Sequence, residues 1–266
     1  MAGRCDAVQL PEAAKPSALE GIDFRMCWDV DRNFGEGCDS GGKFEPLQAQ
    51  HSPGLEIDIF GPEMALAHSL SPRLKAIGIQ RAYFIKFAMG STNLHTNWNP
   101  TNKNTEGKMH TIGYYPRFLE FCKASLASLQ LQEQPDQGID RPLSGMFWLQ
   151  GESDSSKAKD ANAYLANFQL FAKTFREDML APDMPIVVSH VVWNGKKVHV
   201  VNAALEKAGE SAVDDCVSVD PLDKNEYGVQ GADAGICADH LTATGLCEVG
   251  RRMGVAMRLP IPAKSL

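Results

Sequence analysis

Three polar side chains, Gln150, Glu152 and Asp154, occupy alternate positions directly after the apolar run 145–149. An apolar and aromatic run followed at once by small polar residues and a helical pattern is typical of a strand that ends at the edge of a sheet. In open α/β sheets, ligands bind at that edge. These polar side chains therefore either take part in chemistry at that edge or only open the helix that follows.

The composition favours one globular domain that handles a small ligand. The chain has 266 residues, a formal net charge of -7 and 44% hydrophobic residues, which is enough for a large core. Basic residues form no cluster beyond pairs such as Lys196 and Lys197. This argues against a nucleic-acid partner and an anionic membrane partner. We therefore expect a small neutral or polar ligand.

The chain as given shows no targeting or membrane segment. No apolar run approaches the roughly 20 residues that span a bilayer. Residues 1–16 lack the hydrophobic core of a signal peptide. We expect the chain as given to be soluble, and its localisation stays open.

Seven cysteines are scattered along the chain, at positions 5, 27, 38, 122, 216, 237 and 247. Their odd number and irregular spacing favour reduced thiols, with one or two disulfides left as an alternative. Cys237 and His240 form a Cys-x-x-His pair without a second ligand pair nearby, so they are weak evidence for zinc.

From residue 81 onward, strand and helix patterns alternate. Strands are predicted for 81–89, 145–150, 185–193 and 216–220; helices are predicted for 115–130, for the stretch with Leu165 to Met179 on one face, for 199–208, and through Leu246 to Met257. This alternation predicts a mostly parallel sheet with helices on both faces. The loops 29–60 and 90–112 are too long for plain connections, so we expect them to build a site.

One motif can be set aside. Residues 37–43, GCDSGGK, match the Gly-x-x-x-x-Gly-Lys core of a phosphate-binding loop. Phe44 stands where the magnesium-binding Ser or Thr is needed, and the residues after it do not open a helix. We interpret this segment as a flexible turn.

A second motif offers a competing mechanism. Residues 151–155, GESDS, resemble the Gly-x-Ser-x-Gly nucleophile elbow of the α/β-hydrolases, and Ser153, Asp220 and His240 follow in the right chain order. Ser155 replaces the last glycine of the elbow, and no His-Gly-Gly stretch upstream supplies the second oxyanion donor. The elbow is therefore the less favoured hypothesis.

Four separated blocks, taken together, indicate a family. They are IFGPEMALAHSL, IKFAMGSTNLHTNW, WLQGESD and DHLTATGLCEVGRRM, in that order. They resemble the Gly-Pro-Glu helix, the Gly-Gly-Thr block, the Trp-x-Gln-Gly-Glu-x-Asp signature and the His block of the SGNH-type carbohydrate acetylesterases, which comprise carbohydrate esterase family six and the sialate O-acetylesterase domain. WLQGESD is the most specific of the four.

This resemblance implies a fold and an activity. The fold would be a flavodoxin-like three-layer α/β fold of SGNH type, with a mostly parallel sheet and a single domain over residues 1–266. The activity would be serine-type removal of O-acetyl groups from carbohydrate. The resemblance implies no metal or organic cofactor, and its partner is an acetylated carbohydrate or another small acetyl ester.

The resemblance also implies catalytic roles. His240 would be the general base and Glu152 the acid that orients it. The backbone N–H of Gly90 and the side-chain amide of Gln150 would donate to the oxyanion. Possible supporting residues are Asp239, Asp154 and Ser91.

Each of these residues also has a simpler interpretation. His240 could be a helix-entry histidine beside the cap residue Thr242. An acid near a helix N-terminus, as Glu152 would be, contributes only about 0.3–1 kcal/mol. Asp154 and Ser155 are predicted to cap the following helix. Gly90 could serve only as a turn glycine.

The sequence departs from the family pattern at two positions. Cys237 stands where the family usually has an Asp, three residues before His240. Asp239 is adjacent to His240 and cannot readily orient its ring, so that role falls to Glu152. Ser91 replaces the second Gly of the Gly-Gly-Thr block, which could tighten or redirect the acyl pocket.

The nucleophile is not evident in the sequence. The chain opens with residues 1–4, MAGR, which resemble the end of the family's Gly-Gln-Ser-Asn-Met-x-Gly block. We therefore expect a domain truncated before Met1, without its nucleophilic serine and first central strand, and with an apolar slot in the sheet. Ser91, Ser153 and Ser189 are poor replacements, so we expect negligible activity from the chain as written. The alternatives are an inactive carbohydrate-binding protein and, less favoured, an α/β-hydrolase that uses Ser153.

Overall fold

The computed structural model describes residues 5–19, 21–30, 39–52, 57–108, 110–133, 143–220 and 241–259. Its strands are β1 (Cys5–Asp6), β2 (Asp23–Val30), β3 (Glu45–Pro46), β4 (Gln50–Ser52), β5 (Ile57–Phe60), β6 (Arg81–Ala88), β7 (Met146–Trp148), β8 (Ile186–Ser189) and β9 (Cys216–Val219). Its α-helices are α1 (Glu63–Ala76), α2 (Tyr115–Glu133), α3 (Ala158–Asp178), α4 (Val198–Lys207) and α6 (Ala243–Ala256). The predicted strands and helices after residue 81 are all confirmed, with shorter strands than the sequence indicated.

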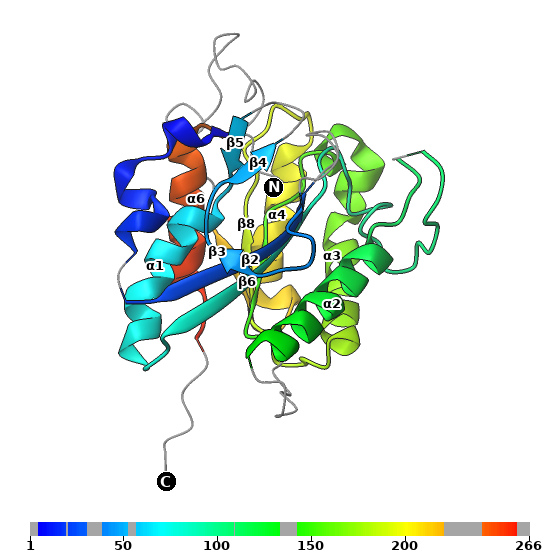
Figure 1. The fold of residues 1–266 in the computed structure, drawn as a ribbon. Helices are drawn as coiled ribbons and strands as arrows, with labels where there is room; N and C mark the ends of the chain where they lie inside the picture. Colours follow the sequence, from blue (N-terminus) through cyan, green and yellow to red (C-terminus); the bar gives the residue numbers. More distant parts are fainter. Residues whose placement is uncertain are drawn as a thin grey trace.

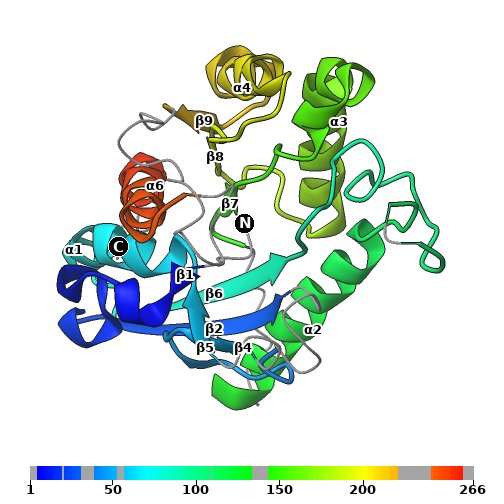
Figure 2. The same cartoon turned by 90° about the horizontal axis from the view of Figure 1, so that it is seen from above.

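The strands form three small sheets in a mixed α/β fold. β2 pairs in parallel with β6 along its whole length, and β7, β8 and β9 form a second parallel set. The third sheet, β1-β5-β4, is antiparallel, and β3 adds an antiparallel edge to β2. The sequence predicted one mostly parallel sheet. The parallel pairing is confirmed, but β6 and β7 each end their own sheet among the described strands (Figure 2).

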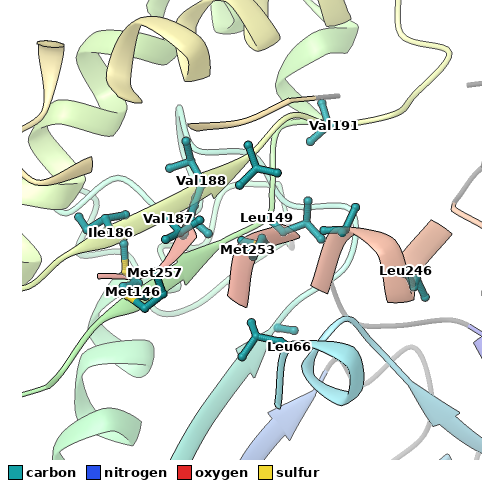
Figure 3. Close-up of a cluster of buried hydrophobic side chains, with 14 of the residues drawn as sticks. Leu66, Met146, Leu149, Ile186, Val187, Val188, Val191, Leu246, Met253 and Met257 are labelled. Atoms are coloured by element: carbon teal, nitrogen blue, oxygen red, sulfur yellow. The ribbon is translucent and has the colours of Figure 1, made fainter. Parts of the chain in front are cut away.

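Helices lie on both sides of these strands. α1 and α6 lie together on one side, and α2 and α3 lie on the other (Figure 1). Met253 of α6 and Met257, which directly follows α6, lie beside the apolar residues of β7 and β8, including Met146 and Ile186 (Figure 3). The buried residues Leu246, Val249, Met253 and Met257 recur every three or four positions, so one face of α6 is buried.

A second packed region joins α2, α3 and β7 through aromatic rings. The ring centroids of Trp148 in β7 and Phe171 in α3 are 4.6 Å apart, and those of the stacked rings Phe118 in α2 and Phe175 in α3 are 4.8 Å apart. Trp98, in the loop after β6, meets Trp148 edge to face at 5.7 Å. Aromatic pairs in these geometries add stability beyond their buried area. The contact between these rings therefore holds the loop after β6 against β7.

A buried ion pair connects the antiparallel sheet to β6. Lys86 Nζ donates to Gln50 Oε1 at 2.7 Å and to Glu63 Oε1 at 2.8 Å, and the backbone N–H of Gly61 also donates to Glu63. Burial raises the pKa of Glu63, but the charge and hydrogen bond of Lys86 outweigh it and hold the pKa below its usual value. The pair fixes β4, β6 and the turn that begins α1. In the described part of the chain, no helix is long and apolar enough to cross a membrane.

Two glycines allow α1 and α6 to pack backbone to backbone. A Cβ on Gly250 would lie 2.0 Å from Pro62 O, and a Cβ on Gly254 would lie 2.9 Å from Leu66 O. Arg73 of α1 donates to the carbonyls of Gly254 and Met257 at 2.6 Å each. A guanidinium at the carboxyl end of a helix satisfies free carbonyls and complements the helix dipole.

Replacing Gly250 with Ala tests this close contact. We expect Gly250→Ala to lower the free energy of unfolding by about 1–3 kcal/mol or more, because the new methyl group overlaps Pro62 and forces the helices apart. Val255→Ala is the control, since Val255 is 57% exposed on the same helix. Chemical denaturation of both variants gives the comparison. Equal stability of the Gly250 variant and the wild type would contradict the packing described.

Candidate active site

The loops that follow β6 and β7 meet although the two strands do not pair. Gln150 Nε2 donates to Thr92 O at 3.0 Å and to Asp154 Oδ2 at 2.8 Å. The Asp154 carboxylate also accepts the backbone N–H of Leu94 at 2.9 Å and that of His95 at 3.2 Å. The Gly-Ser-Thr block and the WLQGESD signature are therefore in direct hydrogen-bond contact.

Asp154 does not cap the helix that follows it. The N-cap position of α3 is Lys157, which makes no side-chain cap, and Ser155 Oγ donates to Glu152 O at 2.7 Å. The prediction that Asp154 and Ser155 cap this helix is therefore wrong. Their oxygens instead meet loop N–H groups and a loop carbonyl, which lie closer than the helix end.

The Asp154 side chain is fully buried, and burial raises its pKa to about 6. Its hydrogen bonds from Gln150, Leu94 and His95 oppose that shift, whereas the nearby charge of Asp160 adds to it. The ionised carboxylate is thus held by N–H groups in a site that partly disfavours its charge.

The loop that carries Gly90 is fixed by its own side chains. Thr92 Oγ1 donates to Met89 O at 2.7 Å and accepts from Trp98 Nε1 at 2.9 Å. Asn93 and Asn97 each accept a backbone N–H from within the same loop. The expectation that the loop 90–112 builds a site stays a prediction, and these bonds show that its first part is internally fixed.

Ser91 adopts a backbone conformation that favours glycine. Its φ is 56° and its side chain is exposed. A non-glycine residue in the left-handed region carries a steric cost between its Cβ and its carbonyl oxygen. The position therefore explains why a glycine suits this block. Gly90, beside it, is partly buried.

The backbone before Glu152 is fixed by Gly151 and by a hydrogen bond to the carbonyl of Gln150. Gly151 has a φ of 150°, and a Cβ there would lie 2.7 Å from Val201 Cγ1, so only glycine fits. Tyr164 OH donates to Gln150 O at 2.6 Å and accepts from Trp148 Nε1 at 3.1 Å. Glu152 itself is partly exposed, and burial among its surroundings raises its pKa.

Ser153 lacks the backbone strain of a nucleophile elbow. Its φ of -67° and ψ of -35° are ordinary right-handed helical values. The elbow depends on a sharp, strained turn between strand and helix. Asp220, the acid in that alternative, is exposed at the end of β9. The local geometry therefore does not favour the α/β-hydrolase mechanism.

His240, Asp239 and Cys237 lie outside the described residues, so their roles stay predictions. The structure does fix the residue that follows them. Leu241 is buried, and its carbonyl accepts the thiol of Cys5 at 3.4 Å. Thr242 caps α6 through a bond from Gly245 N at 3.1 Å, which confirms the predicted cap. The start of α6 thus lies beside β1.

His190 is a buried residue to which the sequence assigned no role. It directly follows β8, and neither of its ring nitrogens has a hydrogen-bond partner among the described residues. Burial lowers its pKa, against the opposing charges of Glu206 and Asp220. A polar residue at the carboxyl end of a predicted strand was the signal that could have drawn attention to it.

Cysteine chemistry and metal binding were also open questions. Cys5, Cys27, Cys122, Cys216 and Cys247 are free thiols, as the sequence favoured. Within the described ranges, no group of three or more His, Cys, Asp or Glu side chains could hold a metal ion.

Replacing Ser91 with Gly tests the strain in the loop. We expect Ser91→Gly to leave the free energy of unfolding unchanged or to raise it by up to about 1 kcal/mol, because relief of the left-handed strain offsets the greater freedom of glycine in the unfolded chain. Ser153→Gly is the matched control, and its ordinary helical backbone predicts a loss of stability. Thermal unfolding of the two variants decides between them. If Ser91→Gly lowers the stability as much as Ser153→Gly does, the backbone strain at Ser91 is contradicted.

The raised pKa of Asp154 makes the stability depend on pH. The folded state binds the Asp154 proton more tightly than the unfolded state, so this contribution is present below about pH 4 and is lost as the pH rises through about 6. We expect the wild type to lose up to about 3 kcal/mol relative to Asp154→Asn between pH 4 and pH 7. Urea unfolding across this range measures the difference. A difference that does not change with pH would refute the assignment.

Comparisons with known proteins identify a family and a shared fold. The family described as carbohydrate esterase, sialic acid-specific acetylesterase, matches residues 41–258. A protein from Arabidopsis thaliana has a similar structure, with a TM-score of 0.64, 19% identity, and coverage of 97% of this chain and 92% of its own. NanS has a TM-score of 0.57, with 13% identity, and covers 88% of this chain and 87% of its own.

A third structure is that of XAC1771, described as a novel carbohydrate acetylesterase from Xanthomonas citri. It has a TM-score of 0.56 and 14% identity; the match covers 96% of this chain but 53% of XAC1771, so this chain spans about half of that protein. No curated protein sequence matches the chain. At these identities, the structures show a shared fold. Because the family match extends over most of its length, this chain belongs to the carbohydrate esterase family of sialic acid-specific acetylesterases.

Proposed function

We propose that the protein hydrolyses O-acetyl esters of carbohydrates, within a single domain of the flavodoxin-like, three-layer SGNH type. One observation carries the proposal. Gln150 Nε2 donates to Thr92 O at 3.0 Å, which joins the WLQGESD signature to the block that holds Gly90. Acyl transfer requires donors and a carboxylate gathered at one edge of the fold, and these two loops supply candidates for both.

In this mechanism, Glu152 orients His240 and stabilises the imidazolium that forms when His240 takes the proton of the nucleophile. The bond between Cys5 and Leu241 supports it, because it holds the residue that follows His240 against the first described strand. The raised pKa of Glu152 has a consequence for activity. Glu152 must be ionised for this role, so hydrolysis should fall as the pH drops and Glu152 takes up a proton.

The proposed oxyanion donors are the backbone N–H of Gly90 and the side-chain amide of Gln150. Both hydrogens of that amide are already donated, to Thr92 O and to Asp154 Oδ2. Gln150 can therefore serve an oxyanion only if one of these bonds opens when the substrate binds.

The nucleophile is proposed to be the serine of the family's Gly-Gln-Ser-Asn block, which the given sequence does not contain. The serines that the structure describes near the site are poorly suited to the role. Ser155 donates to Glu152 O, and Ser189 is buried and donates to the carbonyl of His190. Ser153 lies on an unstrained helical turn, whereas Ser91 belongs to the oxyanion loop.

A comparison of two proteins tests this proposal. One is the 266-residue chain, and the other carries an added apolar strand that ends in Gly-Gln-Ser-Asn directly before Met1. We expect hydrolysis of an aryl acetate and labelling by a fluorophosphonate only in the second. Labelling of Ser153 in the first would revive the α/β-hydrolase mechanism. Binding of an acetylated sugar without hydrolysis by either protein would favour the inactive carbohydrate-binding alternative.

Glu152→Gln, made in the form that carries the added serine, tests the orienting role. The amide keeps the shape of Glu152 but loses the charge that stabilises the imidazolium, so we expect kcat/KM to fall by about two or more orders of magnitude. Stability should change little, which denaturation checks. Ser156→Ala is a control on the same loop, at an exposed position. Near-normal turnover of the Gln variant would move the role to Asp239 or elsewhere.

A further inference from the structure

We propose that Asp154 is a positioning residue that fixes the loop carrying Gly90 relative to the end of β7. Its catalytic meaning rests on the proposed function, whereas the contacts that carry it do not. The hydrogen bonds of Asp154 described above go to Leu94, His95 and Gln150, and not to Gly90 or Glu152. It would act through the backbone that leads to each of them.

The first argument is the arrangement of the described strands. Among these, β6 and β7 end separate sheets, so no pairing between β6 and β7 positions the loops that follow them. Asp154 bridges the gap, since it accepts Leu94 N at 2.9 Å and His95 N at 3.2 Å from the first loop. It also accepts Gln150 Nε2 at 2.8 Å from the end of β7.

The second argument is burial. Asp154 and Leu94 are both 0% exposed, so water cannot replace these bonds when they are lost. A buried N–H without a partner is costly, which makes the loop position sensitive to the acceptor. Thr92, held to Gln150, and Leu94, held to Asp154, are the nearest anchored points after Gly90. Gly90 lies between them and the end of β6.

The third argument is the charge around the carboxylate. Among the described residues, Asp154 forms no ion pair with a Lys or Arg, and its hydrogen-bond partners are N–H groups of the two loops. Asp160, on α3, is a nearby like charge, and His95 Nε2 lies 3.8 Å from Asp160. Burial raises the pKa of the Tyr164 hydroxyl, and the charges of Asp154 and Glu152 raise it further. A carboxylate in this setting serves as an acceptor for the loops.

Amide hydrogen exchange of the 266-residue chain at pH 7 tests the inference without requiring activity. We expect Asp154→Ala to lower the protection of the Leu94 and His95 amides by about tenfold or more, since one hydrogen bond is worth roughly that factor. Asp154→Asn keeps one carbonyl acceptor and should give an intermediate loss. Asp160→Asn, a buried acid that accepts no loop N–H, should match the wild type. Unchanged protection of both amides in Asp154→Ala would overturn the inference.

The pH response gives a readout that simple space-filling would not produce. The ¹⁵N amide resonance of Leu94 should titrate with a midpoint near the Asp154 pKa of about 6. Asp154→Asn should abolish this titration, and Asp160→Asn should shift it to lower pH because a like charge is removed. Leu94 is the reporter because its backbone N–H donates to the Asp154 carboxylate at 2.9 Å. A Leu94 titration that persists in Asp154→Asn would count against the inference.

Kinetics separate this inference from the proposed function. In the form that carries the added serine, Asp154→Asn should lower kcat for an aryl acetate while KM stays within about twofold, because the donor is displaced in the transition state. If that form is inactive but the exchange pattern holds, the proposed function fails and the positioning role stands. If the exchange pattern fails, the positioning role fails whatever the activity.

Discussion

The described strands of two parallel sheets share no backbone ladder, and the loops at their carboxyl ends meet through the side chains of Gln150 and Asp154. In most parallel sheets, the spacing of neighbouring strands fixes the loops that follow them. Here the buried carboxylate of Asp154 and the half-buried amide of Gln150 connect the two loops. The relative position of Gly90 and Glu152 therefore depends on a few hydrogen bonds, and the bond from Leu94 N to Asp154 lies where water cannot substitute.

Packing beneath these bonds keeps them in register. The edge-to-face contact between Trp98 and Trp148 joins the loop after β6 to strand β7, and the Trp148 indole also donates to Tyr164. Tyr164 then donates to the carbonyl of Gln150. The aromatic core and the polar contacts are thus continuous, so the apolar packing of α2 and α3 supports the polar edge of the fold.

Much of this arrangement could be predicted from local pattern. The apolar periodicity of α3 and α6 and the aromatic run of β7 identified the main elements, because each buries one face or one short strand. β2 was not predicted, although Asp23 and Arg25 alternate with buried Phe24 and Met26 in a strand-like period. The strands β1, β3, β4 and β5 are two to four residues long, too short for a periodic signal.

The site was predictable in its residues but not in its contacts. WLQGESD indicated a functional loop, whereas the partners of Asp154 lie about sixty residues earlier in the chain and only the folded structure brings them together. The preference of Asp for helix N-caps predicted that Asp154 caps α3. In the structure, Asp154 instead accepts the backbone N–H groups of Leu94 and His95. The left-handed backbone of Ser91 likewise follows from the turn around it and could not be read from a serine alone.

The glycine contact between α1 and α6 limits how the molecule can move. With Gly250 and Gly254 against the backbone oxygens of Pro62 and Leu66, the two helices have no layer of side chains on which to slide. Shear between packed helices needs such a layer, because it proceeds by small shifts of interdigitated side chains. The helix that begins just after His240 is therefore coupled rigidly to α1. Any opening that admits a substrate must come from hinge motion in the loops, with this helix pair as the fixed base.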